Sequence, residues 1–182
     1  MLVAERENSV SVEETQRQLP AAIRELDLSI VKGKLSDRAT RGREVTNPPV
    51  TLDNLDQAME DYRKFLALCE EFRGFPIVPS YDMDEVWHQH VLFTEKYRGD
   101  CNTVFGEFFE HVPYFGRAEA NVEEDDKVLT NTRALWMKVY GYVPASYEGM
   151  TAPTSSGGWS GTVDLTNGNY MSWEEQEKIL RG

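Results

Sequence analysis

The chain is 182 residues long, carries a formal net charge of −12 and is 40% hydrophobic. This length suits one domain with extra arms, and the apolar content is enough for a modest core. A surface that follows phosphates needs clustered Lys and Arg, so the acidic balance argues against nucleic acid and anionic membranes as partners. No window of about 18 apolar residues occurs, so no membrane insertion is expected.

The cysteine content points to a reducing environment. Cys69 and Cys101 are too few for a disulfide scaffold, so an intracellular, reducing compartment is expected. Residues 1–10 contain early acids and no long apolar run, so no secretory signal is recognised there.

The first expected element is a helix that begins at Ser11, which forms a Ser-x-x-Glu capping box with Glu14. Apolar residues then recur at helical spacing, at Leu19, Ile23, Leu26 and Ile30. Pro20 lies inside this pattern and either kinks the helix or starts a second one. Residues 33–51 hold several Gly, Pro and charged residues, which predicts a long connection.

The clearest helix covers residues 52–73, with one continuous apolar face. The next helix is expected to begin at Asp82, to run to about Tyr97 and to be ended by Gly99. A further short helix is expected over residues 102–110.

The last long helix is expected to begin at Asn121 and to run to Tyr140. Residues 145–171 are rich in Gly, Ser, Thr and Asn, which is typical of a linker or an arm. Ser172 and Glu175 then form a capping box for a short terminal helix.

These elements predict an all-α fold, a small bundle of about four main helices with extended polar arms at both ends. Residues 1–51 form the N-terminal helix and linker, 52–142 the helical core, and 143–182 the C-terminal arm. Isolated aromatic residues of the arm are candidate anchors for a protein partner: Tyr147, Trp159, Tyr170 and Trp173.

The segment from Asp82 to Gly116 contains all three histidines of the chain, His88, His90 and His111, together with Cys101. A helix turns about 100° per residue, so His88 and His90 lie about 200° apart and a straight helix cannot aim both at one ion. Three arrangements remain open. His88 joins His111 and Cys101 while His90 is in the core, or His90 is the ligand and His88 is not, or the helix is distorted.

The candidate ligands are His88, Cys101 and His111, with His90, Asp84 and Glu110 as supporting candidates. Asp84 shares the helix face of His88 and is placed to bind the ion or to orient the imidazole. Such a set suits one transition metal ion, Zn, Fe or Cu, rather than Mg or Ca. The same residues also fit a metal-free polar network that fixes helix packing.

The stretch from Val78 to Gly116 carries a long motif of Asp-Glu-Val-Trp-His-x-His, then Thr, Tyr, Asp-Cys and Phe-Gly, and a close of His-x-Pro-Tyr-Phe-Gly. The residues of the motif are Asp84, Glu85, Val86, Trp87, His88, His90, Thr94, Tyr97, Asp100, Cys101, Phe105, Gly106, His111, Pro113, Tyr114, Phe115 and Gly116. With the helix that precedes it, this motif resembles the glycine-rich domain-containing protein-like family over about residues 52–142. The resemblance implies an α-helical domain and little about activity. Glu110 departs from the family pattern, which has a histidine there.

Two classes of function remain open. The acidic balance, the arms and their aromatic residues favour an interaction or assembly subunit that docks on a larger protein complex. The alternative is a metal-binding protein or a metal-dependent enzyme that uses the His/Cys cluster. The sequence names no reaction or substrate.

Overall fold

The computed structural model describes residues 17–40, 50–111, 122–151 and 170–182 of the chain. Within these ranges all regular secondary structure is helical, which confirms the predicted all-α class. The elements are α1 (Ala21–Arg24), α2 (Ser29–Thr40), α3 (Leu55–Glu71), α4 (Tyr81–Leu92), α5 (Thr94–Phe105), α6 (Val122–Tyr140), the 3-10 turn η1 (Ala145–Tyr147) and α7 (Trp173–Arg181). The predicted helix start at Ser11 and the predicted cap at Asn121 lie outside the described residues.

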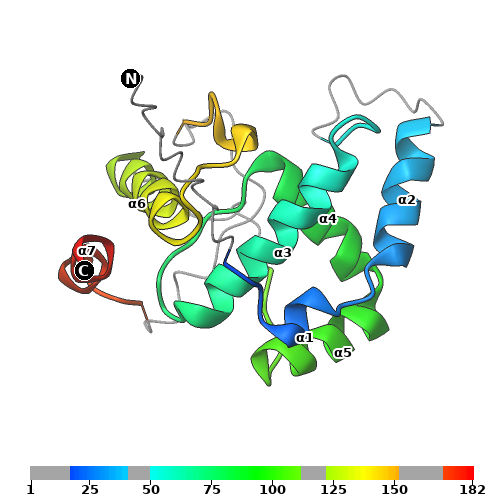
Figure 1. Cartoon of the computed structure of the whole chain (residues 1–182), viewed down its shortest axis with the longest axis horizontal. Coiled ribbons are helices and arrows are strands. Elements are labelled where there is room, and N and C mark those ends of the chain that lie inside the picture. The colour runs from blue at the N-terminus through cyan, green and yellow to red at the C-terminus, as the bar shows by residue number, and fades with distance from the viewer. Residues whose placement is uncertain (1–16, 41–49, 112–121, 152–169) are drawn as a thin grey trace, which may run out of the picture.

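Helix α3 runs through the middle of the helical body in Figure 1 and packs against α1, α2 and α4. Its apolar residues recur three or four positions apart, from Leu55 through Tyr62 to Cys69, and therefore share one side of the helix. The ring of Phe65 is fully enclosed, and burying a side chain of this size stabilises a fold by about 1.5–3 kcal/mol. The prediction of a helix over 52–73 is confirmed, with slightly shorter bounds.

The N-terminal part departs from the sequence expectation. A helix does start directly after Pro20, which was one of the two alternatives, but it is the single turn α1 and does not continue to Ile30. Helix α2 then begins at Ser29 and includes residues 33–40, which were expected to belong to a connection. Val31 and Leu35, one turn apart on α2, are both buried, and α2 packs on α3 and α4. This tertiary packing stabilises a helix that its own charged and glycine-containing sequence does not indicate.

The prediction of one helix from Asp82 to about Tyr97 is wrong. Helix α4 ends at Leu92, where the N–H of Phe93 donates to the carbonyl of His90, and α5 begins at once and continues through Gly99. The break lets α5 fold back on α4. Consequently Trp87 meets Tyr97, and His90 meets Asp100, although both pairs are 10 residues apart. In one continuous helix, a rise of 1.5 Å per residue separates such pairs by about 15 Å along the axis.

The C-terminal helix α7 lies against α6 at the edge of the molecule in Figure 1. The predicted capping box of Ser172 and Glu175 is present at its start. The amide of Asn131 on α6 donates to Gln176 on α7 at 2.9 Å, and both side chains are buried. A paired polar contact at a helix–helix junction fixes the register of the two helices.

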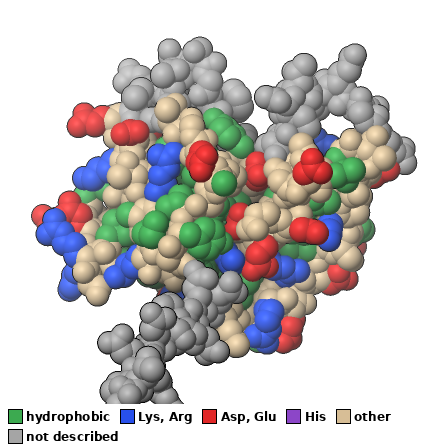
Figure 2. All heavy atoms as spheres, turned by 45° about the horizontal axis from the view of Figure 1, so that its top comes forward, with side chains coloured by type: hydrophobic (Ala, Val, Ile, Leu, Met, Phe, Trp, Pro, Cys, Tyr) green, Lys and Arg blue, Asp and Glu red, His purple; other side chains and the backbone are tan. Residues whose placement is uncertain are grey.

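The surface carries charges of both signs. On the face shown in Figure 2, acidic and basic side chains surround a central group of hydrophobic ones. In the described part of the chain, none of the helices combines the length and the apolar content that crossing a membrane requires.

Candidate metal centre

Helix α4 supplies two of the side chains that form the candidate site. Its N-terminus is fixed by Ser80, whose hydroxyl accepts a hydrogen bond from the N–H of Met83. Asp84 and His88 follow four residues apart, so they stand one above the other on the same face of the helix. The third side chain, His111, lies beyond the end of α5 in a segment without regular secondary structure.

The three side chains converge on one point. Nδ1 of His88 lies 3.3 Å from one carboxylate oxygen of Asp84, and Nε2 of His111 lies 3.1 Å from the other. One nitrogen or oxygen atom from each residue lies within 4.8 Å of the corresponding atoms of the other two. The two imidazole rings are 4.4 Å apart between centroids. The group therefore offers two nitrogen donors and one carboxylate within the reach of a single ion.

The group is enclosed on one side and open on the other. The side chains of Asp84 and His111 are 8% and 7% exposed, whereas that of His88 is 40% exposed. The indole of Trp87 packs edge-on against the His111 ring, with 4.4 Å between centroids. The site is therefore open to solvent on the side of His88, and on the side of His111 it is covered by the ring of Trp87.

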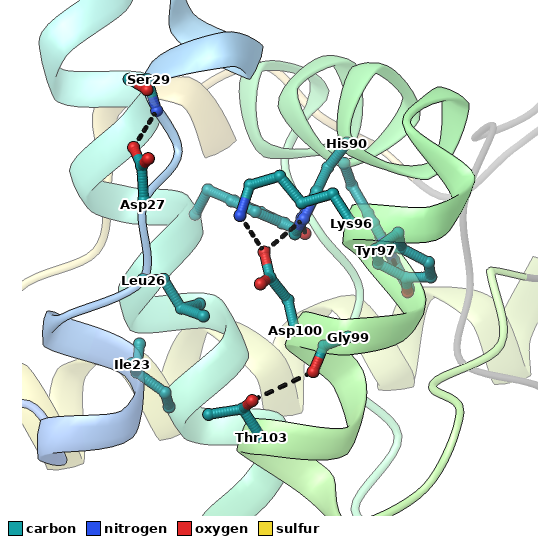
Figure 3. A network of polar contacts seen from close by, with 12 residues as sticks. Ile23, Leu26, Asp27, Ser29, His90, Lys96, Tyr97, Gly99, Asp100 and Thr103 are labelled. Carbon is teal, nitrogen blue, oxygen red and sulfur yellow. Dashed lines mark hydrogen bonds and ion pairs between the residues drawn. The ribbon is translucent and has the colours of Figure 1, made fainter.

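His90 belongs to a separate network in the core, which Figure 3 shows from close by. Its Nδ1 lies 3.0 Å from the hydroxyl of Tyr62, and its Nε2 lies 2.9 Å from a carboxylate oxygen of Asp100. Lys96 donates to the same oxygen at 2.8 Å. A carboxylate only accepts, so we assign the ring proton to Nε2, and Tyr62 then donates to Nδ1. Burial, opposed by Asp100, lowers the pKa of His90, in line with a neutral ring.

Of the three arrangements left open by the sequence, the structure has His88 with His111 and His90 in the core. It does not bring Cys101 to the pair. This thiol is buried beside Tyr97, where burial raises its pKa. Glu110 is exposed and is outside the group formed by the carboxylate and the two imidazoles. The carboxylate that joins them is Asp84, which the sequence indicated only as a supporting candidate.

The predicted partner anchors are in different environments. Tyr147 is 1% exposed and its hydroxyl donates to the carbonyl of Val78 at 2.5 Å, so this ring is part of the core and not an exposed anchor. Tyr170 and Trp173 are partly exposed, and the ammonium of Lys127 lies 4.2 Å from the centre of the Trp173 ring. Trp159 lies outside the described residues.

The chain belongs to the UCP032817-like family, whose profile matches residues 29–137. The matched region runs from the start of α2 into α6 and includes the three residues of the candidate site. Glycine-rich domain-containing protein 2 of Arabidopsis thaliana is 30% identical to the chain over 91 residues. The match covers 48% of this chain and 11% of the plant protein, so the chain corresponds to a small part of that relative. The resemblance to the glycine-rich domain-containing family is thereby confirmed. No solved structure matches.

Proposed function

We propose that the chain binds one divalent transition metal ion through Asp84, His88 and His111. The convergence of a carboxylate and two imidazoles carries this proposal. A tetrahedral ion with metal–ligand bonds of about 2.0–2.2 Å holds its donor atoms about 3.3–3.6 Å apart. The nitrogen–oxygen distances of 3.3 and 3.1 Å, each to a different oxygen of Asp84, are near these values, and the three donor atoms all lie within 4.8 Å of one another. Binding of one ion therefore requires the side chains to move closer together.

The donor set selects the class of ion. Two imidazoles and one carboxylate suit Zn²⁺ and Fe²⁺, whereas Ca²⁺ and Mg²⁺ prefer oxygen ligands. Three protein ligands leave at least one coordination position for water or a small ligand, as in catalytic rather than closed structural zinc sites. The exposure of His88 gives that position access to solvent. An ion held in this way supplies Lewis acidity toward a bound water or carbonyl oxygen.

The same geometry also fits a metal-free state in which Asp84 accepts a hydrogen bond from His111 and pairs with His88 at 3.3 Å. The two states differ in where the ring protons lie. A nitrogen that donates to Asp84 carries a proton, whereas a nitrogen that binds a metal does not, and a neutral imidazole makes this change by moving its proton to the other ring nitrogen. Protons compete with the ion for the imidazole nitrogens, so metal uptake should weaken at acidic pH.

The test is metal content after incubation of the full chain with Zn²⁺ or, under anaerobic conditions, Fe²⁺. We expect one equivalent in the wild type and none in the double variant His88→Ala, His111→Ala. The matched control is Glu110→Gln, which changes an exposed acid next to His111 and should keep full metal content. A wild-type protein without stoichiometric metal contradicts the proposal, as does a double variant that still binds.

The role as an interaction or assembly subunit remains a prediction. Tyr147 is buried and one face of Trp173 is covered by Lys127, so the arm offers fewer exposed aromatic anchors than its sequence suggested. The observations therefore favour metal binding as the first function to test.

A further inference from the structure

His111 is the ligand whose position is least determined by local structure. Helix α5 ends at Phe105, and Gly106 follows in the left-handed conformation with φ of 74°. Residues 107–111 then continue without helical hydrogen bonds. Asp84 and His88 are held by the backbone of α4, but His111 depends on contacts made by its segment with the rest of the fold.

The buried hydroxyl of Tyr97 is hydrogen-bonded both to the backbone that leads to His111 and to the aromatic ring that packs on His111. The Tyr97 hydroxyl donates to the carbonyl of Phe109 at 2.5 Å, two residues before the ligand. The same oxygen accepts the indole N–H of Trp87 at 2.8 Å. The rings of Trp87 and Phe109 stack at 5.1 Å with 11° between their planes, and Trp87 packs against the imidazole of His111. The hydroxyl therefore fixes both the backbone that leads to His111 and the ring that supports it.

We propose that Tyr97 is a positioning residue of the metal site, whose hydroxyl holds the Trp87–Phe109 pair and thereby aims the His111 imidazole at Asp84. This inference rests on the proposed function. The hydrogen bonds of the Tyr97 hydroxyl go to Trp87 and to the carbonyl of Phe109, so it acts on the site through these neighbours. Groups that hydrogen-bond directly to metal ligands alter metal affinity about 10–100-fold when they are removed, and Tyr97 acts one contact further away, so we expect an effect at the lower end of about 10-fold.

The variant Tyr97→Phe removes this hydroxyl and keeps the ring. Its matched control is Tyr140→Phe, because the Tyr140 hydroxyl also donates to a backbone carbonyl, that of Lys64 at 3.1 Å. Tyr140 is on α6, away from α5 in Figure 1. Each variant loses one tyrosine–carbonyl hydrogen bond, and Tyr97→Phe also leaves the indole N–H of Trp87 without its acceptor. A loss of stability should therefore appear in both variants and be larger in Tyr97→Phe, whereas a change at the metal site should appear only in Tyr97→Phe.

Two measurements on the full chain report the metal affinity of the site and the environment of the His111 ring. In the first, Co²⁺ is titrated and its visible absorption followed. We expect Tyr97→Phe to take up one equivalent about 10-fold more weakly than the wild type, with an altered spectrum. In the second, the His111 ring protons are followed by NMR without metal, with His111→Ala used for assignment. The ring current of Trp87 should shift these signals in the wild type and in Tyr140→Phe, and the shift should change in Tyr97→Phe.

The outcomes separate this inference from the proposed function. If Tyr97→Phe has the Co²⁺ affinity, the spectrum and the His111 signals of the wild type, the positioning role is overturned and the metal site stands. If the wild type takes up no Co²⁺, both are overturned.

Should Tyr97→Phe not fold, Phe109→Leu removes the ring that stacks on Trp87 and keeps the backbone carbonyl that accepts from Tyr97. Weaker Co²⁺ binding by this folded variant supports the positioning of His111 through the Trp87–Phe109 pair, and unchanged binding overturns it.

Discussion

Asp100 is expected to contribute strongly to stability because it is the hydrogen-bond acceptor of the buried His90 ring. Its carboxylate accepts from Nε2 of His90 at 2.9 Å, while Tyr62 occupies the other ring nitrogen. The substitution Asp100→Ala leaves the Nε2–H of a fully buried imidazole without this acceptor. Lys96 also loses its partner, but it is partly exposed and can turn to solvent.

The magnitude follows from the two groups involved. A buried donor left unsatisfied costs about 1–3 kcal/mol, and a hydrogen bond to a charged group contributes about 1.5–3 kcal/mol, so we take about 2 kcal/mol for this partly exposed carboxylate. In a chain of this size each kcal/mol lowers Tm by about 2–4 °C, which gives a decrease of about 4–8 °C.

Thermal unfolding followed by circular dichroism measures this change. The matched control is Asp56→Ala, because Asp56 also pairs with a lysine, Lys32 at 2.5 Å, but is 84% exposed. An exposed ion pair contributes little, so the control should unfold close to the wild type. In a His90→Phe background Asp100→Ala should cost much less, because the two residues are coupled. Equal decreases for Asp100→Ala and Asp56→Ala would refute the reasoning.

Three further predictions follow from other parts of the fold. Burial raises the pKa of Asp61, so the folded state binds this proton more tightly than the unfolded chain and the free energy of unfolding falls as pH rises through the raised pKa. Urea denaturation near pH 4 and near pH 7 measures this decrease, which should be smaller in Asp61→Asn than in the wild type. Ser172→Ala removes the α7 capping box and should cost about 1 kcal/mol, seen as faster amide exchange in α7. Leu92→Ala should change stability by less than about 0.5 kcal/mol in urea denaturation, because that side chain is 72% exposed, and a larger loss contradicts the observed end of α4.

The parts of the fold that local sequence determines were predictable. The apolar spacing of residues 52–73 identified α3, and the Ser172–Glu175 pair identified the start of α7. The break at Phe93 was not predictable in this way, because neither Gly nor Pro marks it and it depends on the folding back of α5. Gly99, the expected end, is inside α5, and the buried side chains of Tyr97 and Cys101, two residues away on either side, hold this part of the helix in the core.

In the candidate site, too, some contacts follow from local sequence and others depend on the tertiary structure. The pairing of Asp84 with His88 follows from helical spacing, and the separation of His88 from His90 follows from the same 100° step. The contact of His111 with Asp84 joins residues 27 positions apart and required the tertiary structure. Cys101 lies between His90 and His111 in the sequence, but it follows Tyr97 by four residues on α5, so its thiol is buried beside that ring and not beside His88 and His111.

The most direct test of the metal site is the NMR of the three imidazoles during a Zn²⁺ titration of the full chain. Asp84, His88 and His111 form the proposed site, so the ring nitrogens of His88 and His111 should shift together and saturate at one equivalent. The nitrogens of His90 should remain unchanged, because both are already paired in the core. Signals of His88 and His111 that do not respond to Zn²⁺, or a response of His90 alone, would contradict the account.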